Sequence, residues 1–304
     1  MDLFESDFPN AVKLMRIKEM YRQTESYFRG FLDARLYFQR WVPEGVSTSA
    51  QKGHLVITHG QGEHSESYKT VVDSLAGSGW MISAWDWRGH GRSDGLRGYA
   101  RHFNDYCNDF EVFLETQVFR LKGPYPLVLL SHSMGGLIQL KTLANHSDWP
   151  VRAQILSNPL LGVAVHVPEI KQKAARLSLE LLPKVTLFNE IRDEDLTTDP
   201  DMIVQYSRDS LRHNRISSGA YLGSLEAIEW VKKAAGLIQI ETLLQISTDD
   251  PIVSSAANRE YFQSLSGPKK ILEYGGFKHE LYNEKGREKP LKDLKNYLKS
   301  LHKL

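Results

Sequence analysis

The sequence predicts an α/β fold with a mostly parallel central sheet flanked by helices. Short apolar runs alternate with longer stretches of helical spacing along most of the 304 residues, and such alternation favours parallel strands with helices on both faces. Serine, aspartate and histidine follow directly after three of the runs, where the carboxyl ends of parallel strands form one edge. We expect one domain over residues 1–304, because this class of fold exceeds the usual domain size.

The expected strands begin with a hairpin. Tyr27–Trp41 predicts two strands around a turn at Gly30 and Asp33. Further strands are expected near Leu55, Met81, Leu127, Ala153, Leu243 and Ile271.

Two helices are indicated by their apolar stripes. His102–Phe119 has the stripe Phe103, Phe110, Phe113 and Leu114, and Pro290–Leu304 places Leu291, Leu294, Leu298 and Leu301 on one face. Lys292, Lys295 and Lys299 lie off that face and are interpreted as solvated rather than as a membrane surface. The lone cysteine, Cys107, excludes an internal disulfide and is expected near the core rather than as a nucleophile.

Residues 160–225 interrupt the alternation, and we expect them to form a helical cap inserted over the site. Ile170, Ala174, Leu177 and Leu181 recur at helical spacing, and the run stops at Pro183. The plain interpretation is a cap helix packed on the body of the domain.

A candidate nucleophile lies at a strand-to-helix corner. The segment Ser131–Gly136 (SHSMGG) follows the apolar run Tyr125–Leu130 and precedes a helical stretch. A residue in a tight turn between strand and helix projects its side chain out of the sheet, and small neighbours let the two elements pack closely. The segment matches G-x-S-x-G except at Ser131, so we predict Ser133 as the nucleophile.

A candidate acid and base follow in the order that this corner requires. An aspartate pair, Asp249-Asp250, ends the strand run 242–246, and His279 follows a Gly-Gly turn after the run 270–274. A serine hydroxyl needs an imidazole to take its proton, and the imidazole needs a carboxylate that fixes its tautomer. We predict Asp250 and His279, with Asp249 as the alternative acid.

The loop after the strand near Leu55 is a candidate oxyanion hole. It reads His59-Gly60-Gln61-Gly62-Glu63-His64, and acyl transfer needs backbone N–H groups directed at the developing oxyanion. We assign the amides of Gln61 and Met134 to that role; a plain glycine turn is the alternative. A dinucleotide site is disfavoured, because Ser65 stands where the third glycine belongs and the Ser133, Asp250 and His279 corners would be unexplained.

Three segments together carry a family resemblance: residues 59–65 (HGQGEHS), residues 86–95 (DWRGHGRSDG) and the Ser133 corner. They resemble the monoglyceride lipase and lysophospholipase family of α/β-hydrolases, which is serine aminopeptidase S33-like. The resemblance spans nearly the whole chain and implies an α/β-hydrolase fold with Ser133, Asp250 and His279 as the triad. It also implies Gln61 and Met134 as the oxyanion amides.

The resemblance implies a carboxylic ester hydrolase that acts without a cofactor. Ser133 would form an acyl-enzyme from a monoacylglycerol or lysophospholipid and release the fatty acid after attack by water. The alternatives are a peptidase or thioesterase on the same fold, or an inactive hydrolase-fold binding protein. The cap would also line an acyl tunnel and touch a membrane or micelle; Leu179→Ser with Leu182→Ser tests this.

Composition excludes several other classes. With 38 basic and 37 acidic residues the chain is nearly neutral, which gives no electrostatic reason to expect nucleic acid. Residues Met1–Met20 mix charged and apolar side chains without a continuous hydrophobic run, so we expect no signal peptide and a cytoplasmic protein, peripheral to a membrane at most. No cluster has metal-ligand spacing.

The charged segment Asp86–Gly95 is expected to organise a turn beside the site. We expect hydrogen bonds and ion pairs among Asp86, Arg88, Arg92 and Asp94, with His90 as a structural residue.

Overall fold

The computed structural model describes residues 20–121, 123–164, 176–177, 182 and 184–301. Its main feature is an eight-stranded sheet in the order β1-β2-β4-β3-β5-β6-β9-β10. The β1–β2 and β2–β4 pairs are antiparallel, and every other neighbouring pair is parallel. The strands are β1 Tyr21–Arg29, β2 Arg35–Pro43, β3 Gly53–Thr58, β4 Trp80–Trp85, β5 Leu127–His132, β6 Ala153–Ser157, β9 Glu241–Ser247 and β10 Lys269–Tyr274. The predicted fold class is therefore confirmed.

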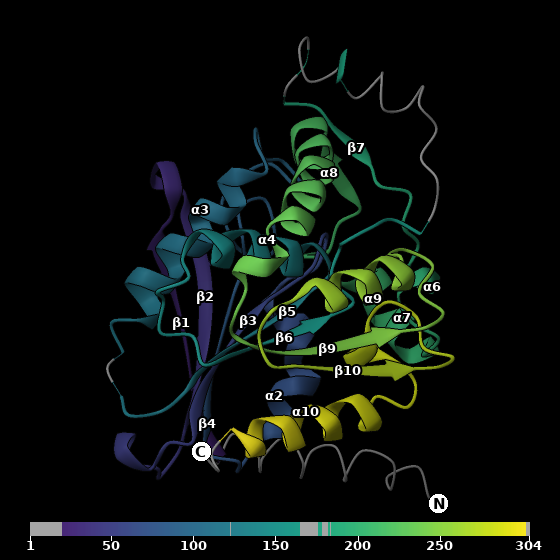
Figure 1. Ribbon diagram of the computed structural model, residues 1–304. Helices are drawn as coiled ribbons and strands as arrows, with labels where there is room; N and C mark the ends of the chain where they lie inside the picture. The colour runs from purple at the N-terminus through teal and green to yellow at the C-terminus, as the bar shows by residue number, and fades with distance from the viewer. Residues whose placement is uncertain (1–19, 122, 165–175, 178–181, 183, 302–304) are drawn as a thin grey trace, which may run out of the picture.

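Helices cover both faces of this sheet (Figure 1). One face carries α3, α4, α8 and α9, and the other carries α2 and α10. Their bounds are α2 Lys69–Leu75, α3 Asn104–Phe113, α4 Ser133–Asn145, α8 Ser218–Lys233, α9 Ser255–Ser264 and α10 Glu288–Ser300.

Each face of the sheet has its own hydrophobic core, because side chains alternate along a strand. In β5, Leu127 and Leu129 join the core beneath α3, α4 and α8, whereas Val128 and Leu130 join the core beneath α2 and α10. A strand buried on both faces reads as a continuous apolar run, which is the pattern that the sequence displays.

The predicted elements differ from the observed ones mainly at their ends. β1 begins at Tyr21, six residues before the predicted start at Tyr27. The helix expected over His102–Phe119 is α3 followed by a π-helical turn, Leu114–Val118. Cys107 is buried in it, as expected, while the prediction for Met1–Met20 lies almost entirely outside the described residues.

The chain between β6 and β9, residues 158–240, is called the crossover segment below. Its elements before α8 are β7 Thr186–Phe188, α6 Asp193–Leu196, α7 Pro200–Arg208 and β8 Arg215–Ser217, and β7 pairs with β8 away from the main sheet. The helix predicted to run up to Pro183 lies outside the described residues, apart from a helical Arg176–Leu177.

Two of the contacts between the crossover segment and the body of the domain are at glycines that have positive φ, Gly62 and Gly98. His213 N–H donates to Gly62 O at 2.9 Å, and Ser217 N–H donates to Gly98 O at 2.8 Å. A Cβ at Gly62 would overlap His213 O, and one at Gly98 would overlap Arg215 O. Only glycine therefore fits at these two contacts.

A search of the described residues finds no helix with the length and apolar character needed to cross a membrane.

Candidate active site

Ser133 lies at the corner between β5 and α4, as the sequence predicts. It is the first residue of α4 and has φ +51, a backbone conformation that residues other than glycine rarely adopt. Close packing makes the corner possible: a Cβ at Gly135 would overlap the carbonyl oxygen of His59. Strain of this kind is typical of functional sites and here directs the Ser133 hydroxyl off the end of the sheet.

The structure brings Ser133, His279 and Asp250 into one hydrogen-bonded chain. His279 Nε2 lies 2.9 Å from Ser133 Oγ, and His279 Nδ1 lies 2.6 Å from Asp250 Oδ2. Because a carboxylate only accepts, the proton belongs on Nδ1, and Nε2 accepts from the serine hydroxyl. Sequence separations of 146 and 29 residues are closed at the carboxyl edge of the sheet.

The structure places Asp250, not Asp249, against the imidazole. Asp250 Oδ1 accepts the backbone N–H groups of Ile252 and Val253 at 2.8 and 3.0 Å, which leaves Oδ2 facing His279. Asp249 instead accepts from Gly276 N–H at 2.7 Å and is exposed. Asp249 thus stabilises the turn before His279.

Burial and charge act in opposite directions on this pair. Burial disfavours both charged forms, but the charge and hydrogen bond of His279 hold the pKa of Asp250 below its ordinary value. Burial likewise opposes the imidazolium, yet Asp250 keeps the pKa of His279 above its ordinary value. The site therefore stabilises a positive imidazole next to Ser133.

The loop that carries Gln61 lies beside Ser133. A Cβ built on Gly60 would lie 2.9 Å from His132 Cδ2 and 3.1 Å from Ser133 Cβ, so the Gly60–Gln61 peptide borders the nucleophile corner. Met134 is buried directly after Ser133. The Gln61 side chain turns away and donates to Arg215 O at 2.7 Å.

Ser131 is fully buried in β5, which lies between β3 and β6. It is in register with Thr58 and Leu156. Its hydroxyl has no hydrogen-bond partner in the described part of the chain. A buried hydroxyl without a partner costs stability relative to a glycine or alanine at that position.

A buried network of charges that the sequence analysis missed borders the triad. Glu280 directly follows His279, and its carboxylate accepts from Arg212 at 2.7 Å and from Tyr206 at 2.5 Å. Glu63 is also buried; it accepts from Gly60 N–H and, at 2.8 Å, from the Tyr68 hydroxyl. Glu63 and Glu280 lie next to predicted site residues, which is a signal for them, whereas nothing local marks Arg212.

The surroundings shift the pKa values of these two glutamates in opposite directions. Burial, and then the charge of Glu280, raise the pKa of Glu63. Burial also opposes ionisation of Glu280, but Arg212 and the other hydrogen-bond donors lower the pKa of Glu280 below its ordinary value. Arg212 accordingly faces at least one full negative charge.

The Asp86–Gly95 segment organises a turn, as expected, but its predicted ion pairs are wrong. Asp86 accepts the backbone N–H groups of Ser65 and Arg92 at 2.7 and 2.8 Å. Arg88 pairs with Asp109 of α3, and Arg92 pairs with Glu66. The arginines thus pair with carboxylates from outside the segment, while each Asp86 oxygen accepts a backbone N–H.

His90 is a buried structural residue in the same segment. Its Nδ1 lies 3.1 Å from Arg88 O, and its ring stacks on Trp87 at 4.2 Å between centroids.

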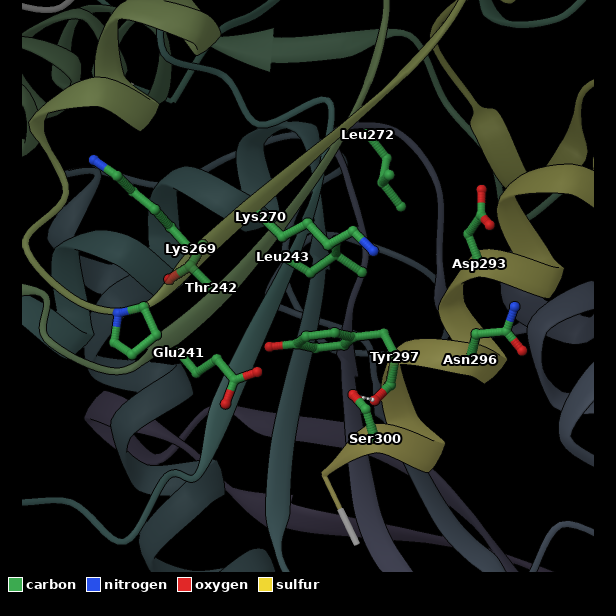
Figure 2. Close-up of a pocket in the computed structure, with 11 residues that line it drawn as sticks. Glu241, Thr242, Leu243, Lys269, Lys270, Leu272, Asp293, Asn296, Tyr297 and Ser300 are labelled. Atoms are coloured by element: carbon green, nitrogen blue, oxygen red, sulfur yellow. Dashed lines mark hydrogen bonds between the residues drawn. The ribbon is translucent and has the colours of Figure 1, made fainter. Parts of the chain in front are cut away.

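No group of three or more histidine, cysteine, aspartate or glutamate side chains in the described ranges has the arrangement of a metal site. A cavity of about 370 Å³ lies elsewhere, between β9, β10 and α10. Figure 2 shows Tyr297 of α10 pointing across it toward Glu241, the first residue of β9. This cavity is thus at the amino ends of strands whose carboxyl ends carry the triad.

The fold and this site together define an α/β-hydrolase. Residues 49–286 match the serine aminopeptidase S33 family of hydrolases, and the chain belongs to that family.

Two relatives of this chain have names that refer to the hydrolysis of lipids. A monoglyceride lipase homolog of monkeypox virus is 29% identical over 82% of this chain and 88% of its own length. The phospholipase YtpA of Bacillus subtilis is 26% identical over 77% of this chain and 90% of its own length. The chain spans only 26% of an uncharacterised abhydrolase domain-containing protein of Dictyostelium discoideum, to which it is 27% identical over 83% of its length.

A solved structure agrees with these matches. The monoacylglycerol lipase of Paleococcus ferrophilus superposes with a TM-score of 0.77 and 27% identity, covering 88% of this chain and 99% of that one. Together the matches confirm the predicted family resemblance and support a carboxylic ester hydrolase.

Proposed function

We propose that the chain hydrolyses a lipid carboxylic ester through an acyl-enzyme on Ser133. The observation that carries this proposal is the continuous chain from Ser133 Oγ through His279 to Asp250 at a strained strand-to-helix corner. A serine placed in this way has a base within hydrogen-bond reach and a carboxylate that orients the base, which are the requirements for nucleophilic acyl transfer.

The reaction proceeds in two halves. His279 Nε2 takes the hydroxyl proton as Ser133 Oγ attacks the ester carbonyl, and the tetrahedral oxyanion is held by the amides of Gln61 and Met134. His279 then gives the proton to the leaving alcohol, and the ester C–O bond breaks. Water, deprotonated by His279, attacks the acyl-enzyme, and collapse of the second intermediate releases the fatty acid and restores Ser133.

Because the relatives are named monoglyceride lipase, phospholipase and monoacylglycerol lipase, the proposed substrate is a monoacylglycerol or a lysophospholipid. In this proposal the crossover segment, including the predicted 160–225 insertion, is a cap that covers the site and contacts a membrane or micelle. Its described part exposes Leu182 to 61% and Phe188 to 63%. Apolar side chains exposed near a lipid-hydrolysing site favour contact with lipid.

Ser133→Ala tests the chemistry. We expect the purified variant to keep its melting temperature and to release no fatty acid from monoacylglycerol or from lysophosphatidylcholine of the same acyl chain. Ser49→Ala, an exposed serine in the β2–β3 connection, is the matched control and should retain full turnover. Turnover by Ser133→Ala near the wild-type level contradicts the proposal. The ratio of the wild-type rates on the two substrates shows which head group is preferred.

The lipid contact is tested separately. Leu182→Ser combined with Phe188→Ser should weaken binding to anionic or neutral phospholipid vesicles and leave hydrolysis of a short soluble ester unchanged. Leu32→Ser, at a 77% exposed leucine in the β1–β2 turn, is the control for loss of exposed apolar area. Equal vesicle binding by the double variant and wild type would exclude this surface.

A peptidase is the second candidate, because the family that the chain matches is described as serine aminopeptidases. The same triad cleaves amides and thioesters. Parallel assays with an aminoacyl-naphthylamide and an acyl thioester discriminate these activities from ester hydrolysis. A phosphonate probe that leaves Ser133 unlabelled would indicate a binding protein without turnover.

A further inference from the structure

The loop that carries His279 is held largely by the crossover segment. Glu280 N–H donates to Leu196 O of α6 at 2.8 Å. The Glu280 carboxylate accepts from Tyr206 of α7 and from Arg212, both within the crossover segment. The residue that directly follows His279 is thus held by both its main chain and its side chain.

A second carboxylate of the same loop repeats this arrangement on the far side of His279. Glu284 accepts from Lys278 N–H at 2.9 Å and from Thr198 N–H at 2.7 Å. One side chain therefore connects the residue before His279 to the crossover segment. Contacts on both sides restrict the positions that the imidazole can occupy.

Asn158, the first residue of the crossover segment, contacts the His279 main chain directly. Asn158 Nδ2 donates to His279 O at 2.6 Å, and Asn158 Oδ1 accepts Ser247 N–H at 2.8 Å, which ties the loop to the end of β9. The peptide between His279 and Glu280 thus lies between two contacts to the crossover segment, Asn158 at its start and Leu196 in α6.

The Glu280 carboxylate is fully committed to this role. Besides Tyr206 and Arg212 it accepts from Asn283 Nδ2 at 2.8 Å, and it is 4% exposed. The Arg212 guanidinium lies over the Tyr206 ring at 3.8 Å, so the two donors also pack on each other. A buried ion pair with several further hydrogen bonds restricts both side chains to one geometry.

We propose that Glu280, held by Tyr206 and Arg212, is a positioning residue that couples the placement of the crossover segment to the alignment of His279 with Ser133. This inference rests on the proposed function, because it assumes that His279 is the base. Glu280 does not touch the reacting atoms; it acts through the peptide that it shares with His279. In this arrangement the imidazole lies within hydrogen-bond distance of Ser133 Oγ.

The coupling predicts that turnover, rather than substrate affinity, depends on Glu280. Misplacing a reacting group by about 1 Å costs on the order of a hundredfold in rate. In Glu280→Gln we expect kcat for a short soluble ester to fall by about ten- to a hundredfold with little change in KM. Rates are expressed per active site titrated with a phosphonate, so that unfolded protein does not count.

The pH profile supplies a readout that packing alone would not change. The charged and titratable groups around His279 are Asp250, Glu280, Glu63 and His132. The Glu280 charge favours the imidazolium, so its removal lowers the pKa of His279. The acid limb of kcat/KM should therefore move to lower pH in Glu280→Gln.

Two further variants complete the test. Tyr206→Phe removes one hydrogen-bond donor to Glu280 with little change in volume, and its loss in kcat should be smaller than that of Glu280→Gln. The double variant Tyr206→Phe with Glu280→Gln should have the same kcat as Glu280→Gln alone, because the two residues act through one contact. Glu273→Gln is the matched control. Glu273 of β10 forms an exposed ion pair with Arg259 at 2.7 Å, so this variant should behave as wild type.

The inference is overturned if Glu280→Gln keeps the wild-type kcat per titrated site and the wild-type acid limb, even if its melting temperature falls. If Glu280→Gln does not fold, an unchanged kcat in Tyr206→Phe overturns it instead. Failure of the proposed function is a different result: Ser133→Ala would then retain turnover.

Discussion

Replacing Asp250 with asparagine changes one atom of the site and should remove nearly all activity. Asp250 Oδ1 accepts two backbone N–H groups, from Ile252 and Val253. The asparagine must therefore leave its oxygen there and turn its NH2 group toward His279 Nδ1. Two donors cannot face each other, so the imidazole proton moves to Nε2, the nitrogen that faces Ser133.

In that tautomer His279 cannot accept the serine proton. The expected loss in kcat is about 10⁴-fold, the magnitude known for the same substitution in a serine protease triad, and it corresponds to roughly 5 kcal/mol of transition-state stabilisation. Fatty-acid release from a monoacylglycerol, measured with titrated enzyme, is the assay. Thermal unfolding by circular dichroism verifies that the variant is folded.

Asp249→Asn is the matched control, since it is the same change one residue earlier on an exposed side chain. It should leave kcat within about twofold, because Asp249 contacts a turn and not the imidazole. The reasoning is refuted if Asp250→Asn retains a tenth of wild-type kcat or if Asp249→Asn loses as much as Asp250→Asn.

Three other predictions concern the corner and its base. The pKa of His279 is raised and catalysis needs the neutral imidazole. A pH–rate profile should therefore show kcat/KM falling, as the pH drops, through a midpoint above the ordinary histidine pKa. A midpoint at or below the ordinary histidine pKa would contradict this prediction. Gly135→Ala places a Cβ that overlaps His59 O and should lower the free energy of unfolding by about 1–3 kcal/mol in urea titrations. In the control Gly236→Ala the nearest atom to the new Cβ is at 3.7 Å, and the free energy of unfolding should stay within about 1 kcal/mol of wild type. Ser131→Ala removes a buried hydroxyl without a partner among the described residues and should raise the free energy of unfolding by about 1 kcal/mol in the same experiment with unchanged kcat; a decrease would indicate that the hydroxyl is satisfied.

The parts of the fold that the sequence predicts well are those with strong local patterns. β5 is a continuous apolar run, because both of its faces are buried, and its side chains divide between the two cores. β1 shows why a boundary fails: Arg22–Ser26 are exposed polar residues on an edge strand, so no apolar pattern marks them and only pairing with β2 makes them a strand.

The site divides in the same way. Ser133 and His279 follow strand ends and turn residues that lie next to them in the sequence, so local patterns identify them. Asp249 and Asp250 have the same local signal, and only the direction in which each carboxylate points distinguishes them. Arg212 is 68 residues from Glu280, and no pattern in either segment predicts that pair.

The contacts at Gly62 and Gly98 bear on how this site can diversify. At both, the crossover segment meets the body of the domain through main-chain atoms, from His213 O and Arg215 O, and not through side chains. Side chains of the segment can therefore be exchanged without changing these two main-chain contacts, apart from Tyr206 and Arg212, which hold Glu280. A mutant library aimed at new acyl or head-group preferences should keep Tyr206, Arg212 and the two glycines constant and vary the other side chains, because a methyl group at either glycine would overlap a carbonyl oxygen of the segment.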